Sequence, residues 1–312
     1  MARKWKILIA ALAVLAVLLA INTLVVQAET KPAAVTVPGA RILHLPGGDM
    51  QVLEKGPRRA PPIVLLHCFA CSLAWWQRMI PFLDRDHRVV ALDLRGFGGS
   101  EKPTSGYSME DQAAFVAEAL KRLGVDHATV VGHSLGGTVA TALTELPGGF
   151  VSRLVIVDQA PDERFATAID FAEELTTAPV IGEALWQVIP DFAVKEGLQV
   201  AFAPGFETPA RFVDGFDQMT YTSYASDDEE AAYLGAEPLN RRIESAGVPL
   251  LAIFGAEDQI YEAEPALAVY AKVPGARTVL VPGAGHSPNV EKPGRTAALI
   301  RQFADSPQPG RR

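Results

Sequence analysis

The chain has 312 residues, of which 49% are hydrophobic and 21% are charged. That share of apolar side chains is enough to build a buried core, so the composition excludes a wholly disordered protein. The formal net charge is −8, from 28 basic and 36 acidic residues. This acidic balance argues against nucleic acid as a main partner, because phosphate binding requires a basic face.

The N-terminus differs in composition from the rest of the chain. Three basic residues lie among the first six, and residues 7–26 then carry no charge and only two polar side chains, Asn22 and Thr23. Without residues 1–28, the chain keeps 25 basic and 36 acidic residues, a net charge of −11. A basic start followed by an apolar run is typical of a secretory signal peptide or of a membrane anchor.

Two main interpretations of this segment stay open. As a signal peptide, residues 1–28 would be cleaved after Ala28, which ends a Val-Gln-Ala sequence. As an uncleaved anchor, residues 7–26 would span about 30 Å at about 1.5 Å per residue, the thickness of a bilayer core. Both place the rest of the chain outside the cytoplasm, since the basic flank stays inside. A buried core helix is a third interpretation, and residues 29–40 predict a short linker.

Beyond the linker, short apolar runs alternate with segments of helical spacing. Strands are predicted at residues 41–45, 50–54, 63–67, 88–93, 128–132, 153–158, 249–254 and 277–281, and helices at 73–83, 109–123, 135–146, 264–273 and 290–303. This alternation predicts an α/β fold with a doubly wound, mostly parallel sheet and helices on both faces. In such folds, ligands bind at the carboxyl ends of the strands.

One stretch interrupts the alternation. Residues 161–238 lack strand-like runs and are rich in aromatic side chains. We interpret them as a helical cap inserted into a core formed by residues 41–160 and 239–305. The alternative is a set of ordinary core helices.

A nucleophile motif lies between a predicted strand and a predicted helix. Residues 132–136 read Gly-His-Ser-Leu-Gly, which fits the G-x-S-x-G pattern. The tight turn between strand and helix holds Ser134 above the sheet, and the two glycines leave room where Cβ atoms would collide. The helix that follows directs N–H groups and its positive end toward developing negative charge. Ser134 is therefore the predicted nucleophile.

A serine hydroxyl needs a general base, which in turn needs an orienting carboxylate. Among the six histidines, only His286 lies in a glycine-rich loop after the last strand, so we predict it as the base. Asp258 follows the preceding strand and is the predicted acid, with the adjacent Glu257 as the alternative. We expect His133 to point away from the site. Three further histidines are predicted at the surface or at strand edges: His44, His87 and His127.

These segments resemble the serine-nucleophile branch of the α/β-hydrolase superfamily. The resemblance rests on residues 66–69, 93–100 and 132–137 and on the segments around Asp258 and His286. It covers about residues 41–303 and extends to the single cap insertion. Enzymes of this fold with an aspartate nucleophile, the haloalkane dehalogenases and epoxide hydrolases, are disfavoured because Ser134 occupies that position.

The resemblance also implies an oxyanion hole formed by two backbone N–H groups. One belongs to Leu135 and the other to Phe69. Family members commonly have His-Gly where this chain has His67-Cys68, which leaves the second donor less well defined. Cys68 and Cys71 form a Cys-x-x-Cys motif, which we interpret as two small apolar core residues. The alternative is an extracytoplasmic disulfide that stiffens the oxyanion loop.

The resemblance implies a hydrolase that cleaves carboxylic esters through an acyl-enzyme, without cofactor or metal. The aromatic cap indicates a small, apolar ester as substrate. Alternatives that use the same triad are a cofactor-free haloperoxidase or perhydrolase, a lactonase and a carbon–carbon bond hydrolase. A non-catalytic binding protein on this fold is a remote alternative. The other expected partner is a membrane, contacted through residues 7–26 if the leader is retained.

Overall fold

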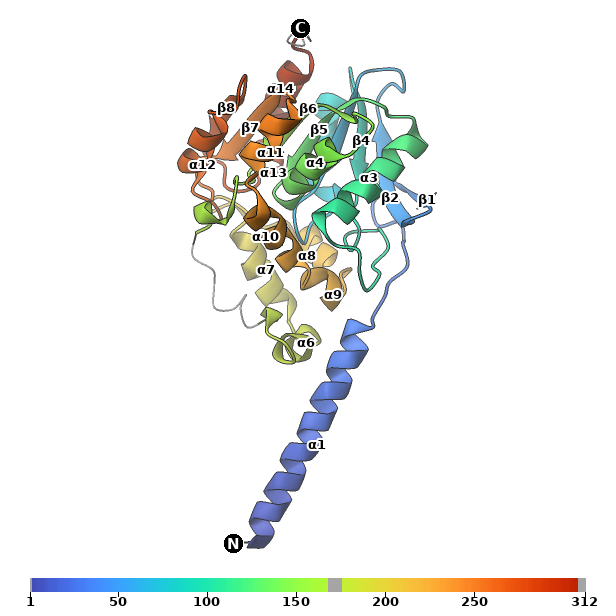
Figure 1. Cartoon of the computed structure of the whole chain (residues 1–312), viewed down its shortest axis with the longest axis vertical. Coiled ribbons are helices and arrows are strands. Elements are labelled where there is room, and N and C mark those ends of the chain that lie inside the picture. Colours follow the sequence, from blue (N-terminus) through green and yellow to red (C-terminus); the bar gives the residue numbers. More distant parts are fainter. Residues whose placement is uncertain (1, 168–175, 308–312) are drawn as a thin grey trace.

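The computed structural model describes residues 2–167 and 176–307 (Figure 1). Its centre is one eight-stranded sheet in the order β1-β2-β4-β3-β5-β6-β7-β8. At one edge, β1 pairs with β2 and β2 with β4, both antiparallel. The six strands β4, β3, β5, β6, β7 and β8 pair parallel to one another. The predicted α/β fold with a doubly wound, mostly parallel sheet is confirmed. The strands are β1 (Arg41–Leu45), β2 (Gly48–Lys55), β3 (Pro62–Leu66), β4 (Arg88–Leu92), β5 (Ala128–His133), β6 (Val151–Val157), β7 (Leu250–Gly255) and β8 (Arg277–Val281).

The central strands are apolar throughout because both faces of the sheet are covered. In β3, Val64 and Leu66 join a large apolar cluster on one face, whereas Ile63 and Leu65 join a second cluster on the other. Helices α3 (Met109–Leu123), α4 (Leu135–Glu145), α11 (Leu239–Ala246) and α12 (Ala263–Tyr270) contribute to the first cluster. The second cluster contains residues of the 3₁₀ helix η1 (Leu73–Trp76), α2 (Ile80–Leu83) and α14 (Pro293–Ala304).

Two predicted helices are interrupted, and proline is the physical reason in both. The helix expected at 73–83 is divided into η1 and α2, with Pro81 in the first turn of α2. The helix expected at 290–303 is divided into α13 (Pro288–Glu291) and α14, which begins at Pro293. Proline lacks a backbone N–H and is compatible only with the start of a helix.

We call residues 161–238 the cap. In its described part, the chain between β6 and α11 forms helices and no strand of the sheet. These helices lie at the end of the sheet where the parallel strands terminate (Figure 1). They are the 3₁₀ helix η2 (Glu163–Phe165), α6 (Ile181–Trp186), α7 (Asp191–Gln199), α8 (Ala210–Phe216), α9 (Tyr221–Tyr224) and α10 (Asp227–Ala236).

The N-terminal segment forms a single long helix, α1 (Ala2–Gln27), that projects from the body (Figure 1). Its stretch Lys4–Gln27 is long and apolar enough to cross a membrane, with a mean hydropathy of 2.8. The segment that follows α1 is bonded to the body. Lys31 forms a β-bridge with Lys102, and the Ala34 N–H donates to the Gly99 carbonyl at 2.9 Å.

Candidate active site

Ser134 lies in the turn between β5 and α4. Its backbone has φ +50° and ψ −126°, a left-handed conformation that costs energy in a non-glycine residue. The turn persists because the surrounding backbone leaves no alternative: a Cβ at Gly132 would lie 2.1 Å from the Gly136 carbonyl oxygen. A Cβ at Gly136 would lie 2.4 Å from the Leu66 carbonyl oxygen. The start of α4 therefore packs directly against the end of β3, and Ser134 is left partly exposed.

His286 and Asp258 form a buried pair after β8 and β7. His286 Nδ1 lies 3.0 Å from Asp258 Oδ2, and their side chains are 3% and 0% exposed. The other carboxylate oxygen of Asp258 accepts the N–H groups of Ile260 and Tyr261 at 2.8 and 3.2 Å. Glu257 is exposed and makes no such contact with His286. Asp258 thus has both oxygens occupied and holds one nitrogen of the imidazole.

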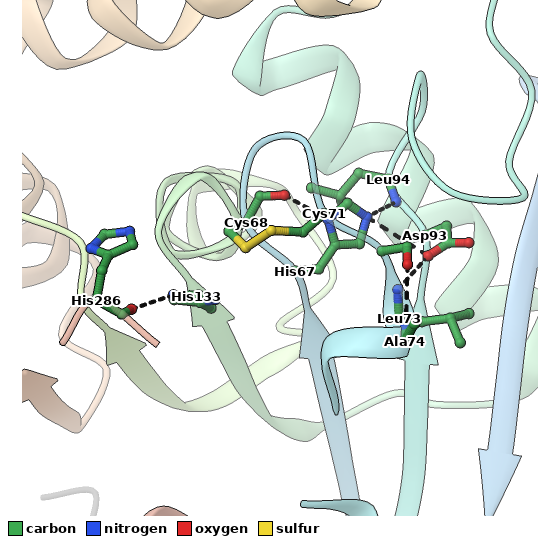
Figure 2. Close-up of a disulfide and its surroundings, with 10 residues drawn as sticks. His67, Cys68, Cys71, Leu73, Ala74, Asp93, Leu94, His133 and His286 are labelled. Atoms are coloured by element: carbon green, nitrogen blue, oxygen red, sulfur yellow. Dashed lines mark hydrogen bonds and ion pairs between the residues drawn. A yellow bond between two sulfur atoms is a disulfide. The ribbon is translucent and has the colours of Figure 1, made fainter. Parts of the chain in front are cut away.

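His133, which directly precedes Ser134, contacts this pair. The rings of His133 and His286 lie 5.2 Å apart, and His133 Nε2 donates to the His286 carbonyl at 2.6 Å (Figure 2). His133 therefore packs against His286 rather than pointing away from it. Burial and the nearby His286 hold the pKa of His133 well below its usual value, so this ring is neutral. Among the described residues, no hydrogen bond joins Ser134 to His286; such bonds often shorten only when substrate binds.

Asp158, which the sequence analysis did not single out, lies behind the His286–Asp258 pair. It follows β6 with φ +46°, is fully buried, and accepts the Gly255 N–H at 2.7 Å. One carboxylate oxygen each of Asp158 and Asp258 and one ring nitrogen of His286 lie within 4.8 Å of one another. Burial, and then the charge of Asp258, raise the pKa of Asp158 well above its usual value. The raised pKa favours the neutral carboxyl form of Asp158, and its second oxygen, Oδ2, is buried without a hydrogen-bond partner among the described residues.

Glu291 on α13 holds the loop on both sides of His286. One of its oxygens accepts the N–H groups of Gly285 and Ser287 at 2.9 and 3.3 Å, and the other accepts the N–H of the cap residue Ala203 at 2.9 Å. Burial raises the pKa of Glu291 above its usual value. A single carboxyl group thus connects the histidine loop with the cap.

Cys68 and Cys71 form a disulfide (Figure 2). The interpretation as two unlinked apolar residues is wrong: the turn brings the two Cα atoms to 5.2 Å, and the two sulfur atoms are bonded. Both half-cystines are also buried, packed with Trp75, Phe202 and other apolar side chains. The bridge closes the loop that carries Phe69.

His67 and Asp93 hold the same loop through hydrogen bonds. His67 Nδ1 donates to the Cys68 carbonyl at 2.7 Å, and His67 Nε2 accepts the Leu94 N–H at 3.0 Å (Figure 2). Burial lowers the pKa of His67, in agreement with this neutral tautomer. Asp93 accepts the N–H of Leu73, two residues after the disulfide, at 2.6 Å. The loop is therefore held by a disulfide, a neutral imidazole and a buried carboxylate.

The two predicted oxyanion donors lie on the elements just described. Leu135 is the first residue of α4, and Phe69 lies between the two half-cystines. Within the described ranges, the backbone N–H groups of Phe69 and Leu135 donate to no protein acceptor. Both groups are thus free to bind an oxygen of a ligand.

The remaining predicted histidines fall into two groups. His44 and His127 are exposed, where they contact Asp49 and the Gly149 carbonyl. His87 lies at the edge of β4, one of its two expected places, and at 1% exposed it is not at the surface. Its ring is covered where Asp305, just after α14, approaches Nε2 at 3.1 Å.

Comparison with known proteins agrees with the topology. The family model of the alpha/beta hydrolase fold matches residues 61–293, most of the chain. The chain belongs to the α/β-hydrolase family. Over 100 residues this hydrolase is 41% identical to a soluble epoxide hydrolase of Corynebacterium sp. strain C12, a match that covers 32% of this chain and 35% of the relative. The chain thus spans about a third of that relative.

Two further comparisons extend over the whole body. The hydrolase is 25% identical over 268 residues to a 2-hydroxy-6-oxo-6-(2′-aminophenyl)hexa-2,4-dienoic acid hydrolase of Metapseudomonas resinovorans, covering 81% of this chain and 86% of the relative. A crystal structure of the N-acyl homoserine lactonase AidH with N-hexanoyl homoserine superposes with a TM-score of 0.72 at 21% identity, covering 87% of this chain and 98% of that one. At that identity, the superposition establishes the shared fold.

Aromatic side chains of the cap cover the hydrolase site. Phe69 contacts Tyr224 of α9, with ring centroids 5.8 Å apart, and Tyr224 in turn contacts Trp186 of α6 at 5.2 Å. On the other side of the disulfide, Trp75 stacks on Phe212 of α8 at 4.0 Å. The oxyanion loop therefore packs against two parts of an apolar cap.

Asp158, Asp258 and His286 are the one group of potential metal ligands within the described residues. Asp258 binds His286 and two backbone N–H groups, and Asp158 accepts the Gly255 N–H through one of its two oxygens.

Proposed function

We propose that this α/β hydrolase cleaves carboxylic esters through an acyl-enzyme formed on Ser134. The observation that carries the proposal is the strained turn at Ser134, next to a buried His286–Asp258 pair. A serine at this turn distinguishes the site from those of epoxide hydrolases of the same fold, whose nucleophile is aspartate. The soluble epoxide hydrolase that is 41% identical matches this chain over only 35% of its own length.

In the proposed mechanism, His286 takes the proton of Ser134 as the oxygen attacks the ester carbonyl. Asp258 holds Nδ1 of the imidazole and stabilises its positive charge. The N–H groups of Phe69 and Leu135 bind the oxyanion, where backbone dipoles are fixed before the reaction. His286 then protonates the leaving alcohol, and water activated by the same imidazole releases the acid. These steps need neither a cofactor nor a metal.

The substrate proposal is a small, apolar ester, because the oxyanion loop packs against cap aromatics. The carbon–carbon bond hydrolase is the second candidate, favoured by the match to the dienoic acid hydrolase over 81% of this chain. We further propose that α1 is an uncleaved anchor and that the body lies outside the cytoplasm. The disulfide supports this location, since such bonds persist in oxidising compartments.

The deciding experiment combines covalent labelling with a substrate panel. A fluorophosphonate probe should label the wild-type protein, and p-nitrophenyl esters of varied chain length should be turned over faster than lactones or a vinylogous diketone. Ser134→Ala should abolish both labelling and turnover while the circular dichroism spectrum stays unchanged. Ser152→Ala, at the far end of β6, is the matched control and should retain both. Turnover of the diketone alone would select the carbon–carbon hydrolase instead.

A further inference from the structure

Exposed apolar side chains outside α1 gather on one part of the cap. In the described chain, seven large apolar residues beyond α1 are exposed, and five of them lie between residues 180 and 200. We call four of these the cap tip: Val180, Ile181, Val188 and Phe192. Val188 and Phe192 are 70% and 68% exposed. Exposed apolar groups that cluster in this way commonly mark an interaction surface.

Helix α6, which carries Ile181 of the cap tip, lies beside the C-terminal end of α1. α1 packs against α6 and α9, and α6 borders the upper end of α1 (Figure 1). Four residues of α1 are partly or fully covered, at spacings of three and four: Leu19, Asn22, Thr23 and Val26. Val26 is only 3% exposed. One face of the last two turns of α1 is therefore joined to the cap, while the other faces are open.

The two polar residues of the apolar run of α1 lie on this covered face. Asn22 Nδ2 and Thr23 Oγ1 are shielded from solvent. Gln27 Nε2 donates to Glu183 Oε1 of α6 at 2.7 Å, and Glu183 is 1% exposed. In membrane-spanning helices, polar side chains face protein rather than lipid. The only two polar groups of the apolar run therefore point where a membrane helix would place them.

The position of α6 along α1 sets its depth. Residues 19–26, which the cap covers, belong to the membrane-length run Lys4–Gln27. At a rise of about 1.5 Å per residue, these residues extend over about 10 Å. If α1 crosses the membrane, α6 and the cap tip lie level with the outer end of that span, at the boundary between headgroups and acyl chains. Apolar side chains are stable at this depth.

We propose that the cap tip is inserted into the outer leaflet of the bilayer that α1 spans, with α1 retained as a structural part of the cap. Cleavage after Ala28 would remove Val26 and Gln27, and with them the cover of Glu183. The outer leaflet is the occupant that we propose, because α6, which carries Ile181 of the cap tip, adjoins α1 at the end of its apolar run. A second part of the proposal, which rests on the proposed ester hydrolysis, is that the substrates are acyl esters dissolved in that leaflet.

The first test locates the cap tip and does not depend on turnover. The full chain is reconstituted in phosphatidylcholine vesicles, with an environment-sensitive fluorophore on Val188→Cys or Phe192→Cys. Phe82→Cys, an exposed apolar position on α2, is the control. Cys68 and Cys71 are joined in a disulfide and take no label. Lipids with brominated acyl chains should quench the probes at 188 and 192 several-fold more than the probe at 82. Equal quenching at the three positions, or a mature protein that begins at Glu29, would overturn the proposal.

The second test addresses the substrate. Replacing both Val188 and Phe192 by Asp should lower turnover of a long-chain p-nitrophenyl ester in vesicles several-fold and leave the soluble acetate ester unaffected. Phe82→Asp should change neither rate. Equal losses on both esters would refute delivery from the membrane. Absence of all ester turnover in the wild-type protein would instead refute the hydrolase proposal, while the quenching result would still decide the docking.

Discussion

Asp158 and Asp258 lie against each other after the neighbouring strands β6 and β7, and only Asp258 contacts His286. Burial raises the pKa of Asp158 well above its usual value. Because Asp258, and not Asp158, is hydrogen-bonded to His286, we propose that Asp158 is a positioning residue that acts through Asp258.

The first prediction distinguishes a neutral role of Asp158 from a charged one. If Asp158 is neutral, Asp158→Asn keeps an acceptor for the Gly255 N–H and supplies an N–H toward Asp258, so kcat should change little. Asp158→Ala removes both groups, which should lower kcat by about tenfold. The pH profile of kcat/KM should shift in the Ala variant and not in the Asn variant. Equal behaviour of the two variants would argue against a neutral Asp158.

The second prediction concerns the choice between neighbouring carboxylates. Asp258→Asn should lower kcat by about 10³–10⁴-fold, because the amide would stabilise the wrong tautomer of His286. Glu257→Gln should leave kcat within about twofold of wild type, since its exposed side chain does not touch the imidazole. Steady-state kinetics on a short p-nitrophenyl ester measure both. A larger loss of kcat in Glu257→Gln than in Asp258→Asn would mean that Glu257, and not Asp258, is the acid.

The third prediction concerns the disulfide next to Phe69. The double variant Cys68→Ala/Cys71→Ala should lose about 2 kcal/mol of stability, the chain-entropy estimate for so short a loop. Because the bridge closes the loop of an oxyanion donor, kcat should also fall while KM stays nearly constant. Thermal unfolding and kinetics of the wild type with and without reductant provide the comparison. A variant with unaltered kcat would show that His67 and Asp93 suffice to hold the loop.

The fourth prediction is a pH dependence of stability from Glu230. This carboxyl group on α10 accepts the Thr138 hydroxyl, and burial raises its pKa to about 8. Between its usual pKa of about 4.5 and about 8, the folded chain binds more protons at this site than the unfolded chain. Its contribution is therefore complete at low pH and is lost as pH rises through that window, by an amount on the order of a few kcal/mol.

Glu230→Gln is the control for this pH dependence, since it mimics the protonated acid. Its melting temperature should equal that of the wild type near pH 5 and exceed it near pH 8. A difference between the two proteins that stays constant with pH would mean that Glu230 is already charged in the folded chain.

The sequence predicted those parts of the site that local pattern determines. A glycine-flanked serine between a buried strand and a helix has one common backbone solution, and Ser134 adopts it. Parallel strands bring their carboxyl ends together, which is why Asp258 and His286 meet although 28 residues separate them. Fold class and strand positions followed from apolar runs in the same way.

Other features depend on contacts that no local pattern encodes. Asp158 follows a buried strand like many residues of this fold, and only its distance from Asp258 distinguishes it. The Cys-x-x-Cys spacing suits both free and bonded cysteines, and the turn at Ala70, with φ +52°, is decided by tertiary packing. His87 is buried because Asp305, more than 200 residues later, covers it.

The bonded segment after α1 has a consequence for how the enzyme would search for substrate. Lys31 and Ala34, which follow the end of α1 by only a few residues, are hydrogen-bonded to Lys102 and Gly99 of the body. An anchor followed by so short and firmly attached a segment leaves the body little freedom to tilt or rise. Every copy would then hold Ser134, the proposed nucleophile, at one fixed height above the bilayer. Encounter with substrate would become a lateral search in two dimensions, governed by surface density rather than by bulk concentration.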